Sequence, residues 1–227
     1  KAAAIKNAGK KLNIAADTLR LFTNKNEVSD AGYSWGVLNE SGTTNISGLA
    51  EIDAIGYESS RAVEATEGTV TLEGLKARVA AYNDAVALFT GTTGQIYVNA
   101  KDGSAGSNTV KLDGNIVAKE AGSQINTALA GADSYLKGFA FGSGTLNLWL
   151  RDSAAWHNES PGTVLPNGYT GSRISKLSGG DDPETAGVIF QNDDKNITIG
   201  DYEGYTRVFY KHDASTPKNI RGGELHI

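Results

Sequence analysis

Apolar and polar residues alternate along short segments of this chain, most clearly at 145–151. That segment reads Thr-Leu-Asn-Leu-Trp-Leu-Arg, so its leucines recur at every second position. In an extended chain this spacing places the leucine side chains on one face, and Trp149 with its polar neighbours on the other. The pattern predicts a half-buried β-strand between residues 145 and 151.

The same alternation recurs in short segments throughout the chain, each bounded by Gly, Asn, Asp or Ser. These segments are Leu12–Ile14, Ala50–Ile55, Thr69–Leu72, Gln95–Val98, Thr109–Leu112, Asn196–Ile199 and Glu224–Ile227. Two of them open hexapeptides of one design, Thr69–Gly74 and Thr109–Gly114, which lie 40 positions apart. This offset suits two coils of roughly 20 residues each, a period found in solenoid proteins.

The pattern favours a stack of coils over a β-sandwich. In a solenoid each strand pairs with its counterpart one coil later, and the inward side chains form ladders. A sandwich would show longer strands joined by two-residue hairpins, and Asn-Gly pairs are scarce in this sequence. We therefore predict an all-β chain folded as a parallel β-helix. The longer insertions Lys101–Asn108 and Pro161–Gly171 are expected to bulge from turns.

Two segments also fit a helix. Between Leu72 and Phe89 the apolar residues follow a 3-4-3-4-3 spacing, which is typical of an amphipathic helix. Alternation in the same region and Gly74 inside it favour strands, because a glycine inside a helix costs roughly 1 kcal/mol. Lys1–Lys11 is rich in Ala and Lys and predicts a short capping helix over the open edge of the first coil.

Composition narrows the class of protein. With 227 residues and no evident linker, 1–227 is predicted to be a single domain. The net charge of −5 argues against a broad surface for nucleic acid or anionic membranes. The absence of cysteine excludes disulfides and thiolate chemistry, so stability must come from repeated burial. The chain also lacks methionine, a signal peptide and an apolar run of membrane-spanning length, so we expect a processed or excised piece of a longer protein.

From residue 130 onward the order of several short motifs becomes specific. They are Asp133–Gly138, Leu146-x-Leu148-x-Leu150, Ala154–Trp156, Ser172-x-Ile174-x-x-Leu177, Gly187–Phe190, Ile197–Ile199, Tyr202–Gly204 and Gly222–Leu225. This succession resembles the passenger region of bacterial autotransporters, the type V secreted surface proteins. The resemblance covers 130–227 well and 1–129 more weakly, as degenerate repeats.

The resemblance implies a right-handed parallel β-helix of the pectin-lyase type, carried to the outer-membrane surface by a C-terminal translocator barrel. It also implies a role in adhesion, in aggregation or as a structural stalk. We expect the barrel, and with it the anchor, to lie outside these residues. The insertions Pro161–Gly168 and Asp181–Glu184 depart from the family pattern and would extend turns.

Catalytic chemistry has little support in the sequence. Ser143, between two glycines, and His157 come nearest to a nucleophile and its base, but a tight corner is the simpler role for Ser143. The three histidines, His157, His212 and His226, are too widely spaced to predict a zinc site. The alternative function is a polysaccharide lyase or hydrolase on the same fold, which would need carboxylates clustered with Arg or Ca²⁺ on one exposed sheet.

Acidic and aromatic residues supply the candidate sites. The candidate Ca²⁺ ligands are Asp181, Asp182, Asp193 and Asp194, although solvated turns are the simpler interpretation. The candidate exposed aromatic residues, for glycan or protein contact, are Trp149, Tyr202, Tyr205 and Tyr210, with packing between coils as the alternative. Trp156 is predicted to lie in the core.

Together these patterns predict a non-catalytic passenger segment at the bacterial cell surface, tethered to the outer membrane or released. It would need no cofactor and would bind a host or bacterial surface protein, a glycan or another copy of itself, and no nucleic acid.

Overall fold

The computed structural model describes residues 2–25, 32–81, 83–100, 104–159, 171–191, 196–210 and 223–225. Within these ranges the regular structure consists of strands without a helix, so none of the described residues forms a helix that could cross a membrane. The strands are β1 (Ala2–Lys25), β2 (Tyr33–Gly56), β3 (Ser59–Ala65), β4 (Thr69–Ala80), β5 (Asp84–Thr90), β6 (Gln95–Val98), β7 (Val110–Asp113), β8 (Asn115–Ala118), β9 (Gln124–Ala130), β10 (Tyr135–Lys137), β11 (Ala140–Gly142), β12 (Thr145–Arg151), β13 (Ala155–His157), β14 (Gly171–Ser178), β15 (Gly187–Gln191), β16 (Asn196–Glu203), β17 (Thr206–Tyr210) and β18 (Gly223–Leu225).

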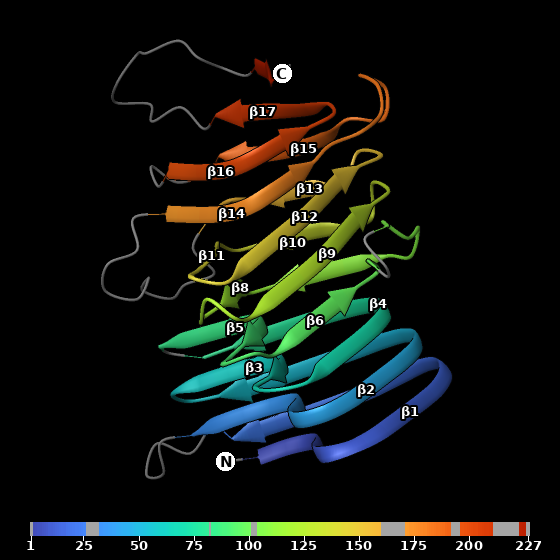
Figure 1. The fold of residues 1–227 in the computed structure, drawn as a ribbon, viewed down its shortest axis with the longest axis vertical. Helices are drawn as coiled ribbons and strands as arrows, with labels where there is room; N and C mark the ends of the chain where they lie inside the picture. Colours follow the sequence, from blue (N-terminus) through green and yellow to red (C-terminus); the bar gives the residue numbers. More distant parts are fainter. Residues whose placement is uncertain are drawn as a thin grey trace.

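All the described strands belong to one large sheet, which curls around an apolar interior (Figure 1). Of the pairings between these named strands, only β17–β18 is antiparallel, and the others are parallel. β1 and β2 each have 24 residues, so each follows the full curve of the sheet, and they pair with each other along most of their length. Later in the chain the same path is divided among shorter strands.

The parallel pairings arrange these strands in three columns. The first column continues from the opening parts of β1 and β2 through β3, β5, β8 and β11. The second runs through the opening part of β4 and then β6, β9, β12, β14 and β16. The third runs from the final parts of β1, β2 and β4 through β7, β10, β13, β15 and β17.

Inward side chains in register form the core ladders. The ladder inside the third column consists of Leu21, Ile52, Ala77, Leu112, Leu136, Trp156, Ile189 and Val208. All its members belong to one hydrophobic cluster or pack against it. The leucines of β12 are buried in the same cluster, which confirms the inward face predicted for 145–151. Stacked burial therefore supplies the stability that other chains gain from disulfides.

The strands predicted in the helix-compatible region are confirmed, because 69–80 and 84–90 form β4 and β5. The capping helix predicted for Lys1–Lys11 is wrong. Residues 2–11 belong to β1, where Ile5 pairs with Val37 and packs against the core. Pairing with a neighbouring strand outweighs the helical propensity of the alanines, which is worth only tenths of a kcal/mol per residue.

The 40-residue repeat is also wrong as a coil period. Thr69 of β4 pairs with Gln95 in the second column, whereas Val110 of β7 pairs with Leu75 in the third. The two hexapeptides look alike because every column demands the same alternation of inward and outward residues. Similarity of the strands therefore does not reveal which column they occupy.

The insertions predicted from the sequence are described only in part. Residues 104–109 connect β6 to β7 without forming a strand, while 101–103 lie outside the described residues. Of Pro161–Gly171, only Gly171 is described, and it begins β14. Residues 181–184 form a turn between β14 and β15, as predicted for a turn extension.

Candidate binding site

The outer face of the third column carries two ladders of side chains, one on each side of the inward apolar ladder. We name the first the Arg20 ladder; its leading members are Arg20, Glu51, Lys76, Lys111 and Tyr135. We name the second the Phe22 ladder; it consists of Phe22, Asp53, Arg78, Asp113, Lys137, His157, Phe190 and Phe209. Register sets both ladders, because successive side chains of a strand point to opposite faces.

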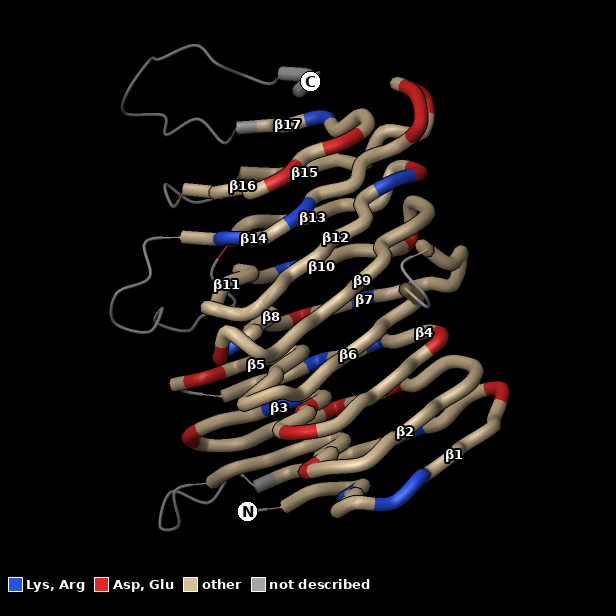
Figure 2. Tube along the Cα trace, viewed as in Figure 1, with Lys and Arg blue, Asp and Glu red and all other residues tan. Residues whose placement is uncertain are grey.

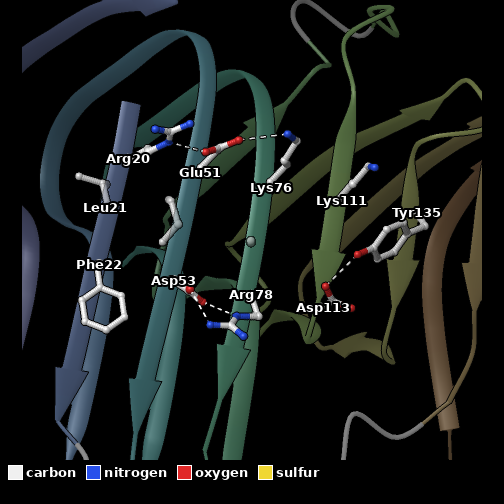
Figure 3. A pocket seen from close by; sticks show the side chains of 12 residues that line it. Arg20, Leu21, Phe22, Glu51, Asp53, Lys76, Arg78, Lys111, Asp113 and Tyr135 are labelled. Carbon is white, nitrogen blue, oxygen red and sulfur yellow. Dashed lines mark hydrogen bonds and ion pairs between the residues drawn. The ribbon is translucent and has the colours of Figure 1, made fainter. Parts of the chain in front are cut away.

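A hollow of about 410 Å³ lies on this face, across β1, β2, β4, β7 and β10 (Figure 3). It is lined by the five leading members of the Arg20 ladder, by the first four of the Phe22 ladder, and by Leu21, Ile52 and Ala77 between them. Charged residues elsewhere are spread along the whole stack, and the turn at 181–184 is acidic (Figure 2). The hollow is distinctive because charged side chains of both signs from four strands, β1, β2, β4 and β7, line one concave surface, with Tyr135 of β10 beside them.

Two of the carboxylates in the hollow are held by cations. Glu51 accepts hydrogen bonds from Arg20 Nε at 2.8 Å and from Lys76 Nζ at 3.0 Å, and these two bonds lower the pKa of its carboxyl. Asp53 accepts two bonds from the Arg78 guanidinium, at 2.6 Å from Nε and 2.7 Å from Nη2. This two-point contact raises the pKa of Arg78. Glu51 is therefore held in its charged form, and the Asp53 carboxylate is fixed in place by the Arg78 guanidinium.

The third carboxylate is bound by a phenol. The Tyr135 hydroxyl donates a hydrogen bond to Asp113 Oδ2 at 2.9 Å. Burial, followed by this bond and the charge of Asp113, raises the pKa of Tyr135 to about 12. Tyr135 thus stays protonated at neutral pH, and its hydroxyl acts as a donor to Asp113.

Lys111 differs from the other charged members of the hollow. It stands in register with Lys76 on one side and with Tyr135 on the other. Among the described residues it makes neither a hydrogen bond nor an ion pair, whereas Lys76 contacts Glu51 (Figure 3). Its ammonium group is therefore available to a ligand.

Aromatic rings occupy the far end of the Phe22 ladder. His157 stacks on Phe190 with ring centroids 4.8 Å apart, and Phe190 stacks on Phe209 at 5.5 Å. Phe209 is 43% exposed, and Phe22 at the opposite end of the ladder is 63% exposed. The Phe22 ladder thus begins with an exposed aromatic ring, continues with charged side chains, and ends with three stacked rings.

The structure does not bring the predicted aromatic residues together. Trp149 is half-buried on the outer face of β12, whereas Tyr202 on β16 packs against the core from the inner face. Tyr205 lies at the corner that precedes β17 and bridges to Gly180. Tyr210 pairs with Gln191 through its backbone, and its side chain lies outside the described residues. The three described side chains, those of Trp149, Tyr202 and Tyr205, therefore do not define a common surface.

Of the four acidic residues proposed as Ca²⁺ ligands, the structure describes two. Asp181 and Asp182 are exposed, and Asp182 accepts hydrogen bonds from Thr185 that lower the pKa of its carboxyl. Asp193 and Asp194 lie outside the described residues. Within the described ranges, no group of three or more His, Asp or Glu side chains could hold a metal ion.

The structure also places Trp156, Ser143 and one of the three histidines. Trp156 is fully buried, as predicted, and its indole Nε1 donates to the Gly138 carbonyl at 3.0 Å. Ser143 lies in the turn between β11 and β12, while His157 is committed to its stack with Phe190 in the third column. His212 and His226 lie outside the described residues.

Sequence reasoning missed the hollow, although a signal for it exists. Charged residues two positions apart occur in three segments that pair with one another: Glu51 with Asp53, Lys76 with Arg78, and Lys111 with Asp113. Each doublet places two charges on the same outward face. The register that joins the doublets could not be predicted, because it does not follow a fixed spacing.

Compared with family models, with curated proteins and with solved structures, the chain shows no match. Its function must therefore be inferred from the geometry of its surface.

The ion pairs of the hollow should make stability depend on acid. Because the pKa of Glu51 in the folded state lies below its ordinary value of 4.5, the carboxylate stabilises the fold above that pH. This contribution is lost as the pH falls through the lowered pKa. We expect the melting temperature of Glu51→Gln to fall less than that of the parent chain between neutral pH and about pH 3. Scanning calorimetry across this range measures the difference.

Glu67→Gln is the matched control, because it removes a carboxylate from an exposed turn outside the hollow. It should keep the acid dependence of the parent chain. An identical acid dependence for Glu51→Gln and Glu67→Gln would contradict the stabilising role of the Glu51 pairs.

Proposed function

We propose that this chain is a non-catalytic segment of an extracellular bacterial surface protein, acting in adhesion, in aggregation or as a rigid stalk. It would form a right-handed parallel β-helix of the pectin-lyase type, as in the autotransporter passengers that its C-terminal motifs resemble. Its partner would be a host or bacterial surface protein, a glycan or a second copy of the chain. Tethering would use a translocator barrel outside these 227 residues.

The stacked columns support the fold in this proposal. Successive segments pair in parallel and in register, and one apolar cluster extends from Ile5 in β1 to Val208 in β17. A continuous core of this kind makes an extended and stiff body, because each level is packed against the next. Such a body suits a protein that holds a surface away from its anchor.

The contacts of the three carboxylates in the hollow support the proposal that the chain is not an enzyme. A glycoside hydrolase needs one carboxyl group with a raised pKa as a general acid. Here the pKa of Glu51 is lowered, Asp53 is held by two bonds from Arg78, and Asp113 accepts the Tyr135 hydroxyl. The carboxylates therefore organise the cations of the surface and are poorly placed to transfer protons.

One observation favours the alternative, a polysaccharide lyase or hydrolase. The hollow does gather three carboxylates and two arginines on one exposed sheet, which is the arrangement expected of such an enzyme. Activity would then require substrate binding to break at least one of the ion pairs.

A glycan array combined with a cell-aggregation assay tests the proposal. We expect the purified chain to bind surface glycans or to promote aggregation, and to leave polyuronides and neutral polysaccharides uncleaved. Product analysis after prolonged incubation measures cleavage. Turnover that disappears in both Glu51→Gln and Asp53→Asn would overturn the non-catalytic assignment in favour of the enzyme.

A further inference from the structure

Two positively charged side chains, Lys76 and Lys111, occupy adjacent positions of the Arg20 ladder. Glu51 is shared between Arg20 and Lys76, and the next member, Lys111, is a second cation beside Lys76. Like charges at neighbouring positions of paired strands are destabilising. An anion placed between the two ammonium groups would remove this repulsion.

The donors left free in the hollow define what such an anion would meet. An ammonium group has three donors, so Lys76 retains two beyond its bond to Glu51, and all three of Lys111 remain. Arg78 is held by Asp53 and so is not a competing partner. The charge of Arg78 also lies close enough to Asp113 to offset that carboxylate. The hollow can therefore take one anionic group, at Lys111 and Lys76.

The rest of the hollow suits a ligand with an apolar face. The Tyr135 hydroxyl is committed to Asp113, so Tyr135 offers the wall of its ring beside Lys111. Phe22, which is 63% exposed, offers a second ring at the β1 end. The volume of about 410 Å³ falls within the range of small-molecule sites and would admit a sugar ring. Sugar rings combine CH faces that pack on aromatic rings with hydroxyls that bond to polar groups.

We infer that this hollow binds an acidic sugar of a glycan chain, with its carboxylate or sulfate group between Lys111 and Lys76. The inference rests on the proposed binding function and names the class of ligand. Lys111 is the main contact of the anionic group, Lys76 is the second, and the ring of Tyr135 contacts the face of the acidic sugar. The ring of Phe22, at the β1 end of the hollow, contacts a further sugar of the same glycan chain.

Titration calorimetry at low ionic strength tests this site with three tetrasaccharides: a heparin fragment, an oligogalacturonate and uncharged cellotetraose. We expect the parent chain to bind at least one acidic probe and to bind cellotetraose more weakly. Lys111→Gln should weaken binding of the acidic probe by about tenfold or more, because it removes a charge-assisted contact. Added salt should weaken the parent complex. The stronger of the two acidic probes distinguishes a sulfate from a carboxylate ligand.

Two further variants keep the test decisive. Lys111→Glu would pair with Lys76, so it should fold at least as stably as the parent chain and yet lose binding. Lys119→Gln makes the same change of charge as Lys111→Gln at an exposed lysine outside the hollow, which contacts Glu120 at 3.6 Å. It should bind like the parent chain.

Equal losses in Lys111→Gln and Lys119→Gln, or equal binding of cellotetraose and the acidic probes, would overturn the site. So would the absence of binding to both acidic probes. Adhesion or aggregation that survives in Lys111→Glu would overturn the site and leave the proposed function standing. Turnover of a polysaccharide would instead overturn the proposed function, whatever the Lys111 variants do.

Discussion

Replacing Trp156 with alanine is expected to lower the free energy of unfolding by about 3–5 kcal/mol. Trp156 has 0% of its side chain exposed and is among the largest fully buried residues of the core. The substitution leaves a cavity between Leu136 and Ile189, its neighbours in the inward ladder of the third column. It also removes the donor that satisfies the Gly138 carbonyl. Urea unfolding followed by circular dichroism measures the loss.

Trp149→Ala is the matched control for this prediction. Trp149 lies on β12, the strand that precedes β13 in the chain, and its side chain is half-buried on the outer face. Its replacement by alanine removes the same number of atoms as Trp156→Ala. We expect a loss of less than about 1 kcal/mol. Equal losses for the two tryptophans would mean that the inward and outward faces have been assigned wrongly.

Gly142→Ala is the second substitution expected to have a large effect, at about 3 kcal/mol or more. Gly142 has φ +140°, and an added Cβ would lie 1.8 Å from the carbonyl oxygen of Ala118, its partner in the sheet. That oxygen also accepts the Gly144 N–H at 2.9 Å. Relief of the clash would require the two strands to move apart and break this bond. Thermal and urea unfolding would both report the loss.

Gly131→Ala separates the clash from the backbone cost. Gly131 also has a positive φ, +80°, but an added Cβ there meets nothing within 4 Å. Its substitution should cost only about 1–2 kcal/mol, the penalty of the left-handed conformation. If Gly131→Ala proved as damaging as Gly142→Ala, the close approach of β8 and β11 would not be the cause.

The sequence predicted the strands and their inward faces because alternation depends only on neighbouring residues. Leu146, Leu148 and Leu150 face the core as their spacing requires, and the same rule separates Trp156 from Trp149. The register between strands depends instead on the length of the connections, which varies. Leu75 and its partner Val110 are 110 − 75 = 35 positions apart, with β5, β6 and the insertion between them, whereas Tyr135 and its partner Ala155 are 155 − 135 = 20 positions apart, with only β11, β12 and short turns between them.

The candidate site depends on this register and therefore could not be predicted from the sequence. Lys76 and Lys111 become neighbours only because the insertion between β6 and β7 returns the chain to the third column. Among the aromatic residues predicted from the sequence, Tyr202 lies on the inward face of its strand. Tyr202 stands in register with the buried Leu177, and its side chain packs partly buried against the apolar core.

The direction of the hydrogen bonds has a mechanical consequence. Bonds between parallel strands run from one level of the stack to the next, along its long axis. A force applied along that axis therefore acts on the hydrogen bonds between successive levels, and we expect the levels to separate one after another. The paired residues Tyr135 and Ala155 are 155 − 135 = 20 positions apart, and this length of chain spans roughly 70 Å when fully extended. A stack of this design lengthens in steps under load, while the levels that have not separated keep their surfaces.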